Sequence, residues 1–157
     1  MPLVSIPLPA KEQKKTTEQG VATGYRISFD AMLDADRPGA LSLSIRGSDS
    51  NEKHKNLATI VVAKSGIRAN TCLLAPSDPG SWRHVSLQWI PTQSSDRTVQ
   101  VTITTEHGDT WQQNVPLEYF FFSHATDIQI ISFGDPDTKA YIDNVVVTSH
   151  SLSLIHI

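Results

Sequence analysis

The chain has 157 residues, about the length of one domain, and 18% of them are charged, which is below the roughly 25% of an average domain. The formal net charge is −3 and the lysines and arginines are scattered, so the sequence lacks the basic stripe that nucleic-acid binding requires. No apolar stretch approaches the ~20 residues that span a bilayer as a helix, and the single cysteine excludes an internal disulfide. These features argue against a nucleic-acid partner and against membrane insertion.

The first half of the chain predicts strands after a polar beginning. Residues 1–20 are rich in proline and lysine, and we expect a linker or a loosely attached edge segment there. From residue 24 the stretch GYRISFDAML alternates apolar and polar side chains, which predicts a strand with one buried face. Its inward residues are Tyr25, Ile27, Phe29, Ala31 and Leu33, and LSLSIR continues the pattern with Leu41, Leu43 and Ile45.

A hairpin is predicted where LATIVVAK is followed by GIRANTCLLA, with its turn around Ser65 and Gly66. We read the second of these stretches as one strand in which Cys72 is a small buried residue. Further strands are predicted at WRHVSLQWI, RTVQVTITT, TWQQNVPL, DIQIISF and AYIDNVVV. Their inward residues include Val85, Leu87, Trp89, Val99, Val101 and Ile103.

No helical period is found after residue 20, and turn signals recur about every ten residues, which is the spacing of sandwiches and jelly rolls. The sequence therefore predicts an all-β protein, an antiparallel two-sheet β-sandwich of nine or ten strands. The sandwich domain is expected to comprise residues 21–151.

The last six residues, LSLIHI, have a separate interpretation. They can be reverse-translated to a DNA sequence that resembles the mosaic-end adapter of transposase-based sequencing libraries. We therefore expect residues 152–157 to be adapter read-through, to make no specific packing, and to stand where the natural protein continues. The alternative is a short apolar strand or a frayed terminus.

Three stretches together resemble a known family: YRISFDAML, then GSWRHVSLQW, then IQIISFGDPDTKAYIDNVVV. They are similar to the laminin-G-like, concanavalin A-like jelly rolls of bacterial extracellular proteins. In that family a strand opens with W-x-x-V, matched by Trp82 and Val85, and the domain closes on I-D-x-V, matched by Ile142, Asp143 and Val145. The resemblance covers roughly residues 24–148 and departs at TITTEHGDTW, where the family usually has a Tyr-x-Asp-Gly strand end.

The resemblance implies that the first and last strands, about 24–33 and 140–148, lie side by side in one sheet. Asp30 and Asp143 would then be neighbours. In related carbohydrate-binding modules an aspartate of the closing strand coordinates a structural calcium ion, which takes six to eight oxygen ligands. Asp143 and Asp30 are therefore candidate calcium ligands. The alternative is that Asp143 accepts hydrogen bonds from backbone amides of a neighbouring loop in a buried turn.

Catalytic patterns of this fold are missing from the sequence. Glycosidases of the fold carry acidic residues alternating along one strand, and its polysaccharide lyases use a Gln-x-His strand with a Tyr-rich partner. Neither pattern occurs, there is no Gly-x-Ser-x-Gly elbow, and the six histidines lack the spacing of zinc ligands. We therefore expect that the protein is not an enzyme.

Sugar recognition needs an aromatic face for the apolar side of a pyranose and polar groups for its hydroxyls. Trp111 follows a turn, where its ring can be exposed, whereas Trp82 and Trp89 are expected to fill the core. Filling the core remains the alternative for Trp111 as well. The polar faces of the predicted strands add four candidate ligand-binding residues: Arg46, Gln100, Thr102 and Gln113.

These observations predict a non-catalytic, lectin-like carbohydrate-binding module of a larger extracellular or cell-surface bacterial protein. Its partners would be a polysaccharide or other glycan and the neighbouring domains of the longer chain. The alternative is a structural or protein-interaction β-sandwich that acts as a spacer or adhesion domain without binding sugar. An exposed aromatic ring beside a concave sheet favours the first function, and a convex surface of hydroxyl groups alone favours the second.

Overall fold

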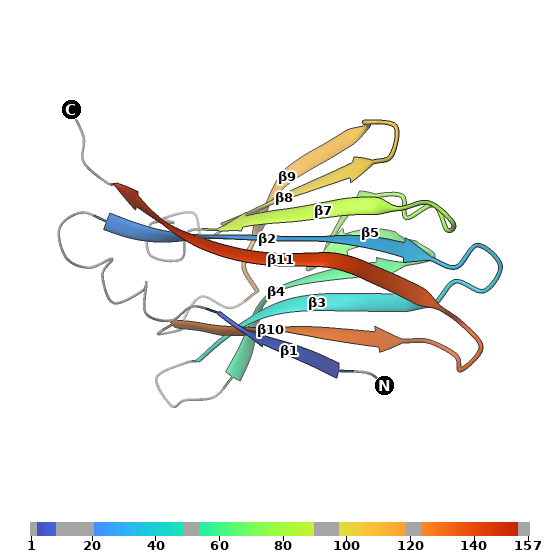
Figure 1. The fold of residues 1–157 in the computed structure, drawn as a ribbon, viewed down its shortest axis with the longest axis horizontal. Coiled ribbons are helices and arrows are strands. Elements are labelled where there is room, and N and C mark those ends of the chain that lie inside the picture. Colours follow the sequence, from blue (N-terminus) through green and yellow to red (C-terminus); the bar gives the residue numbers. More distant parts are fainter. Residues whose placement is uncertain (1–2, 9–20, 49–53, 90–97, 119–123, 154–157) are drawn as a thin grey trace.

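A computed structural model describes residues 3–8, 21–48, 54–89, 98–118 and 124–153 of the chain. In these ranges the backbone forms eleven β-strands in two stacked sheets (Figure 1). Every pair of neighbouring strands is antiparallel. The predicted all-β, antiparallel two-sheet β-sandwich is thus confirmed, although the described ranges form eleven strands instead of the expected nine or ten. Nothing in the described ranges is helical, so they hold no helix long and apolar enough to cross a membrane.

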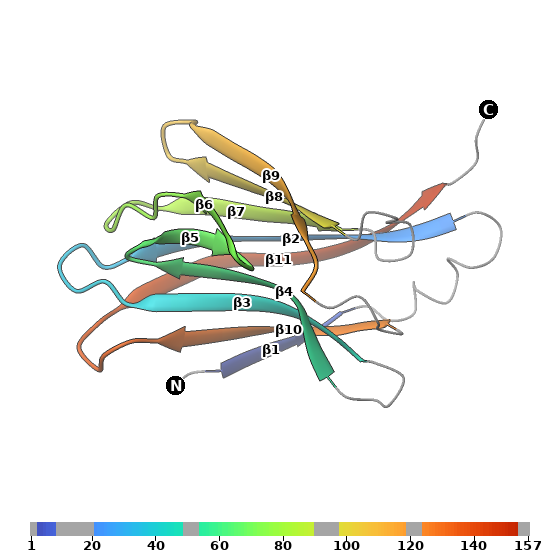
Figure 2. The same ribbon diagram turned by 180° about the vertical axis from the view of Figure 1, so that it is seen from behind.

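The six-stranded sheet, which faces the viewer in Figure 2, has the order β1 (Leu3–Pro7), β10 (His124–Phe133), β3 (Ala40–Ser48), β4 (His54–Ala63), β5 (Gly66–Ala69) and β6 (Cys72–Ala75). The five-stranded sheet has the order β11 (Ala140–Ser153), β2 (Val21–Leu33), β7 (Arg83–Trp89), β8 (Thr98–Thr105) and β9 (Thr110–Pro116). The first and last predicted strands are neighbours, as expected, because β2 pairs with β11 along its whole length.

The two ends of the chain take part in these sheets. Within the segment 1–20, residues Leu3–Pro7 form the edge strand of the six-stranded sheet and pair with β10. At the other end, Leu152 and Ser153 pair with Ala22 and Val21 as the last residues of β11. This backbone pairing corrects the expectation that residues 152 and 153 make no specific packing, while residues 154–157 lie outside the described ranges.

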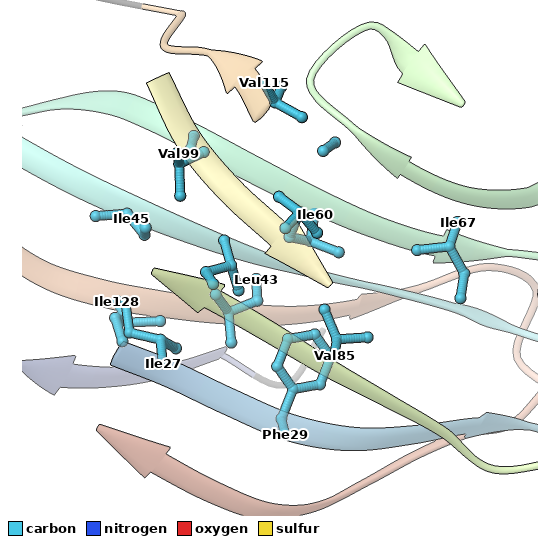
Figure 3. Close-up of a cluster of buried hydrophobic side chains, with 14 of the residues drawn as sticks. Ile27, Phe29, Leu43, Ile45, Ile60, Ile67, Val85, Val99, Val115 and Ile128 are labelled. Atoms are coloured by element: carbon cyan, nitrogen blue, oxygen red, sulfur yellow. The ribbon is translucent and has the colours of Figure 1, made fainter. Parts of the chain in front are cut away.

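The core lies between the two sheets and is built by the alternation seen in the sequence. Successive side chains of a strand point to opposite faces, so every second residue of each strand enters the core. All fourteen inward residues named for 25–33, 41–45, 85–89 and 99–103 belong to one buried cluster. Figure 3 shows side chains of both sheets meeting there, among them Ile27, Phe29, Leu43 and Ile60.

Three sequence-based expectations about single residues are corrected. GIRANTCLLA forms two strands, β5 and β6, because Asn70 turns the chain with a left-handed φ of 53°, which asparagine tolerates. Cys72, at the start of β6, is half-buried rather than buried. Trp89 is in the core, 5.9 Å from the ring of Tyr25, but Trp82 lies outside the core cluster and is half-buried.

Candidate functional site

The outward side of the five-stranded sheet carries polar side chains from edge to edge. Residues directly opposite each other in the register share a face, so the strand pairs define three parallel rows. The first row is Thr148, Arg26, Gln88, Gln100 and Asn114; the second is Val146, Ser28, Ser86, Thr102 and Gln112; the third is Asp143, Asp30, His84, Thr104 and Thr110. We call these fifteen residues the polar face. Only Val146 among them is apolar, and the rows span about 19 Å at the usual strand spacing.

Several side chains on the polar face have hydrogen-bonding capacity to spare. Arg26 Nη2 and Gln88 Oε1 are 3.5 Å apart, which is a weak contact. Within the part of the chain that the structure describes, the side chains of Gln100, Gln112 and Asn114 make no hydrogen bond at all. Each amide offers two donors and one acceptor oxygen in one plane. The first and second rows therefore present free planar groups to solvent.

The third row is organised around the carboxylate of Asp30. His84 Nδ1 lies 2.7 Å from Asp30 Oδ1, and Asn144 Nδ2 donates to Asp30 Oδ2 at 2.8 Å. Asn144 reaches Asp30 because β11 contains a bulge between Asp143 and Val146, where Asn144 adopts a φ of 53°. The backbone N–H of Asn144 donates in turn to Asp143 Oδ1 at 2.8 Å. Asp143 thus stabilises the bulge in β11.

These contacts change the acidity of Asp30. Partial burial acts to raise the pKa of Asp30, but the hydrogen bonds from Asn144 and His84, with the charge of the imidazolium, outweigh it. The pKa of Asp30 is therefore lowered from its usual value.

Acid is expected to remove the contribution of Asp30 to stability. A carboxyl whose pKa is lowered on folding stabilises the protein above its unfolded pKa of about 3.9 and ceases to do so as the pH falls through the folded value. Asp30→Asn should therefore cost about 1 kcal/mol at pH 7, allowing for the exposure of His84, and much less at about pH 2. Urea denaturation at both pH values measures this. Asp36→Asn, at an exposed aspartate, is the control, and a cost independent of pH would contradict the role given to Asp30.

The candidate calcium ligands are brought together but are already engaged. Asp143 and Asp30 are opposite each other in the register, as expected. Both oxygens of Asp30 and one of Asp143 accept hydrogen bonds, and the described residues contain no group of three or more His, Cys, Asp or Glu side chains suited to a metal. Because calcium needs six to eight oxygens, the described side chains do not fit it, and calcium binding stays a prediction. Asp143 accepts from an amide of its own exposed strand, not from a loop over a buried turn.

The five candidate sugar-binding residues do not form one site. Gln100 and Thr102 are adjacent on β8 in the polar face. Trp111 and Gln113 are opposite Ile103 and Val101, which point inward, so both lie on the inner side of the sheet at its edge strand. Trp111 is half-buried against the core.

Arg46 belongs to the other sheet. It lies on β3, where its Nε is 3.7 Å from Asp127 Oδ1, and both side chains are largely buried. The alternation on β3 was predicted correctly, but alternation within a strand does not tell to which sheet the strand belongs. Arg46 and Gln100 therefore lie in different sheets and do not face a common ligand site.

Two aromatic residues that were not among the candidate ligand-binding residues are found at one end of the polar face. Tyr141 is opposite Met32 and two residues before Asp143, so it points to the same side, and it is 39% exposed. Trp82 is two residues before His84, and its position outside the core cluster agrees with the same alternation. Extending the period backwards from His84 and Asp143 would have identified both.

Comparison with known proteins identifies the fold. No protein-family model matches the chain, and no curated protein matches it in sequence. Among solved structures, the PL-14 alginate lyase from Aplysia kurodai matches with a TM-score of 0.58 at 10% identity, over 85% of this chain and 72% of the lyase. A family 7 alginate lyase matches with a TM-score of 0.53 at 11% identity, over 87% and 63%. The seed lectin of Lotus tetragonolobus matches with a TM-score of 0.52 at 9% identity, over 96% and 79%.

At these identities the likeness is one of fold. The chain has the concanavalin A-like jelly-roll fold that the sequence resemblance implied. The narrower laminin-G-like assignment stays a prediction.

Proposed function

We propose that the protein binds an extended carbohydrate chain across the polar face without cleaving it. The observation that supports this most directly is the row of Arg26, Gln88, Gln100 and Asn114, which places one planar hydrogen-bonding group on each of four neighbouring strands. Sugars present several hydroxyl groups along one edge. Side-chain amides can donate to and accept from these hydroxyls, and a guanidinium group can donate to two of them at once. A surface of hydroxyl groups alone, as in a spacer domain, would lack these planar groups.

The aromatic end of the polar face supports the same function. Tyr141 on β11 and Trp82 before β7 are separated by β2, which places their strands about 10 Å apart. An aromatic ring packs against the apolar face of a pyranose, while the neighbouring polar rows take its hydroxyls. The exposed ring of Tyr141 is one of the features that favour carbohydrate binding over a spacer function.

The fold supports carbohydrate binding, and the sequence supports binding without catalysis. Alginate lyases and a seed lectin share the fold, and their names denote carbohydrate ligands. We extend the proposal to a binding role without catalysis because the alternating acidic strand and the Gln-x-His strand are missing from the sequence. The module would act in an extracellular or cell-surface protein, next to other domains of a longer chain.

Affinity electrophoresis in gels that contain soluble β-glucan, alginate or chitosan tests the proposal. We expect retardation of the wild type by at least one of them. Gln88→Ala combined with Gln100→Ala should weaken that affinity about tenfold to a hundredfold, since each truncation removes hydrogen bonds worth about 1 kcal/mol.

The matched control is Gln129→Ala, a glutamine on the outer side of the six-stranded sheet, opposite Ser44. Its affinity should equal that of the wild type. Equal affinity of the double variant and the wild type, or loss of affinity in Gln129→Ala, would place the site elsewhere. If none of the polysaccharides retards the wild type, the function as a spacer or adhesion domain is favoured instead.

A further inference from the structure

A separate pocket opens beside the turn between β8 and β9, at the end of the five-stranded sheet. It has a volume of about 440 Å³, within the usual range for sites that hold a small ligand. The lining side chains that carry charge or an aromatic ring are Asp78, Arg83, Glu106, His107, Asp109 and Trp111. None of them belongs to the polar face, so this pocket is a second candidate site.

The charges in the pocket do not balance. Arg83 is 6% exposed, donates from Nε to the carbonyl oxygen of Pro76 at 3.3 Å, and has its Nη2 3.6 Å from Asp78 Oδ2. Asp78 therefore serves as the counter-ion of Arg83. Glu106 accepts a hydrogen bond from the backbone N–H of Trp82 at 2.8 Å, and Asp109 makes no side-chain hydrogen bond to any described residue. The described residues thus leave two carboxylates, Glu106 and Asp109, without a cationic partner.

Trp111 adds an aromatic wall to the pocket beside these two carboxylates. Its indole is half-buried against the core and also lines the pocket, so the ring is held in place before any ligand arrives. A cation over an aromatic face is attracted by the ring quadrupole, most strongly by that of tryptophan. Carboxylates beside such a ring form short charge-assisted hydrogen bonds with the same cation. The group that fits an aromatic wall and two carboxylates without a cationic partner is an ammonium group.

We infer that this pocket binds a sugar ring that carries a free primary ammonium group, with Trp111 against the ring and Glu106 and Asp109 near the charge. The choice of a sugar rests on the function proposed for the polar face. Glu106 accepts a hydrogen bond from the backbone N–H of Trp82, which lies at the aromatic end of that face, so the pocket adjoins that end. The ligand class is therefore an amino sugar in its deacetylated form.

The decisive comparison uses two monosaccharides that differ only in the group at C2, which is a charged ammonium in one and a neutral acetamide in the other. Methyl glucosaminide carries the ammonium group and methyl N-acetylglucosaminide does not, and both are small enough to test the pocket without the polar face. Quenching of tryptophan fluorescence at pH 6 should show binding of the first that is about tenfold tighter than that of the second. Asp109→Asn should abolish this preference, because the amide keeps the shape of the side chain but loses its charge.

Two controls separate this site from the polar face. Asp36→Asn removes an exposed carboxylate elsewhere and should keep the preference, as should Gln88→Ala combined with Gln100→Ala. Equal binding of the two monosaccharides by the wild type, or a preference that survives in Asp109→Asn, would overturn the inference. If the wild type prefers methyl glucosaminide but no polysaccharide retards it, the pocket is supported and the function proposed for the polar face is contradicted. If a polysaccharide retards the wild type but the two monosaccharides bind equally, the polar face is supported and the pocket is contradicted.

Discussion

Replacing Phe29 by alanine is expected to lower the free energy of unfolding by about 3 to 5 kcal/mol. Phe29 has no exposed area and lies between the sheets beside Val85, its partner in the register (Figure 3). The truncation removes apolar contacts and leaves a cavity that two hydrogen-bonded sheets cannot close. Urea denaturation followed by tryptophan fluorescence measures the change.

Phe133→Ala provides the comparison for this substitution. Phe133 ends β10, is 36% exposed and lies outside the core cluster. Its removal should cost about 1 kcal/mol or less, as for most surface positions. Equal losses in the two variants would mean that the space between the sheets is not the principal core.

The second large effect is expected at Asn70, which joins the two sheets. Its Oδ1 accepts from the N–H of Thr59 on β4 at 2.9 Å, and its Nδ2 donates to the carbonyl oxygen of Pro116 on β9 at 2.6 Å. Asn70→Ala loses both bonds and places alanine at a φ of 53°. We expect a loss of about 2 to 4 kcal/mol, from two hydrogen bonds and the left-handed backbone.

Asn70→Gly separates these two causes. Glycine adopts the left-handed conformation without steric cost but supplies no side chain, so it should recover only the backbone part, about 1 kcal/mol. The remaining loss then measures the hydrogen bonds to Thr59 and Pro116. A glycine variant as stable as the wild type would show that these two bonds contribute nothing, and chemical denaturation of both variants decides the matter.

Alternation along single strands was predictable because it is a local property. The inward residues of β2, β3, β7 and β8 follow from a period of two, and the structure confirms them. The division of β5 from β6 was missed because it depends on Asn70, whose side chain bonds both to the preceding strand β4 and to Pro116 on β9, which is distant in the sequence. The same period, carried two residues further back from His84, would have placed Trp82 outside the core.

The candidate sites depended on contacts between strands, which the alternation along a single strand does not determine. Gln100 and Thr102 were named from the sequence and lie on the polar face, but their partners Arg26, Gln88 and Asn114 come from three other strands. Arg46 was grouped with them because it lies on the polar side of its own strand, but that strand belongs to the other sheet.

The sequence by itself therefore determined that the chain is an all-β sandwich and which side chains of each strand point the same way, since the pleat of one strand settles both. Only the tertiary structure decided which strands are neighbours, because sheet order depends on burying all the inward faces together. The order β11, β2, β7, β8, β9 assembles the polar face, and because β9 is the edge strand, the inward-pointing Trp111 is only half-buried and lines the pocket. The residues of the polar face are far apart in the sequence and are brought together by the strand order of the five-stranded sheet.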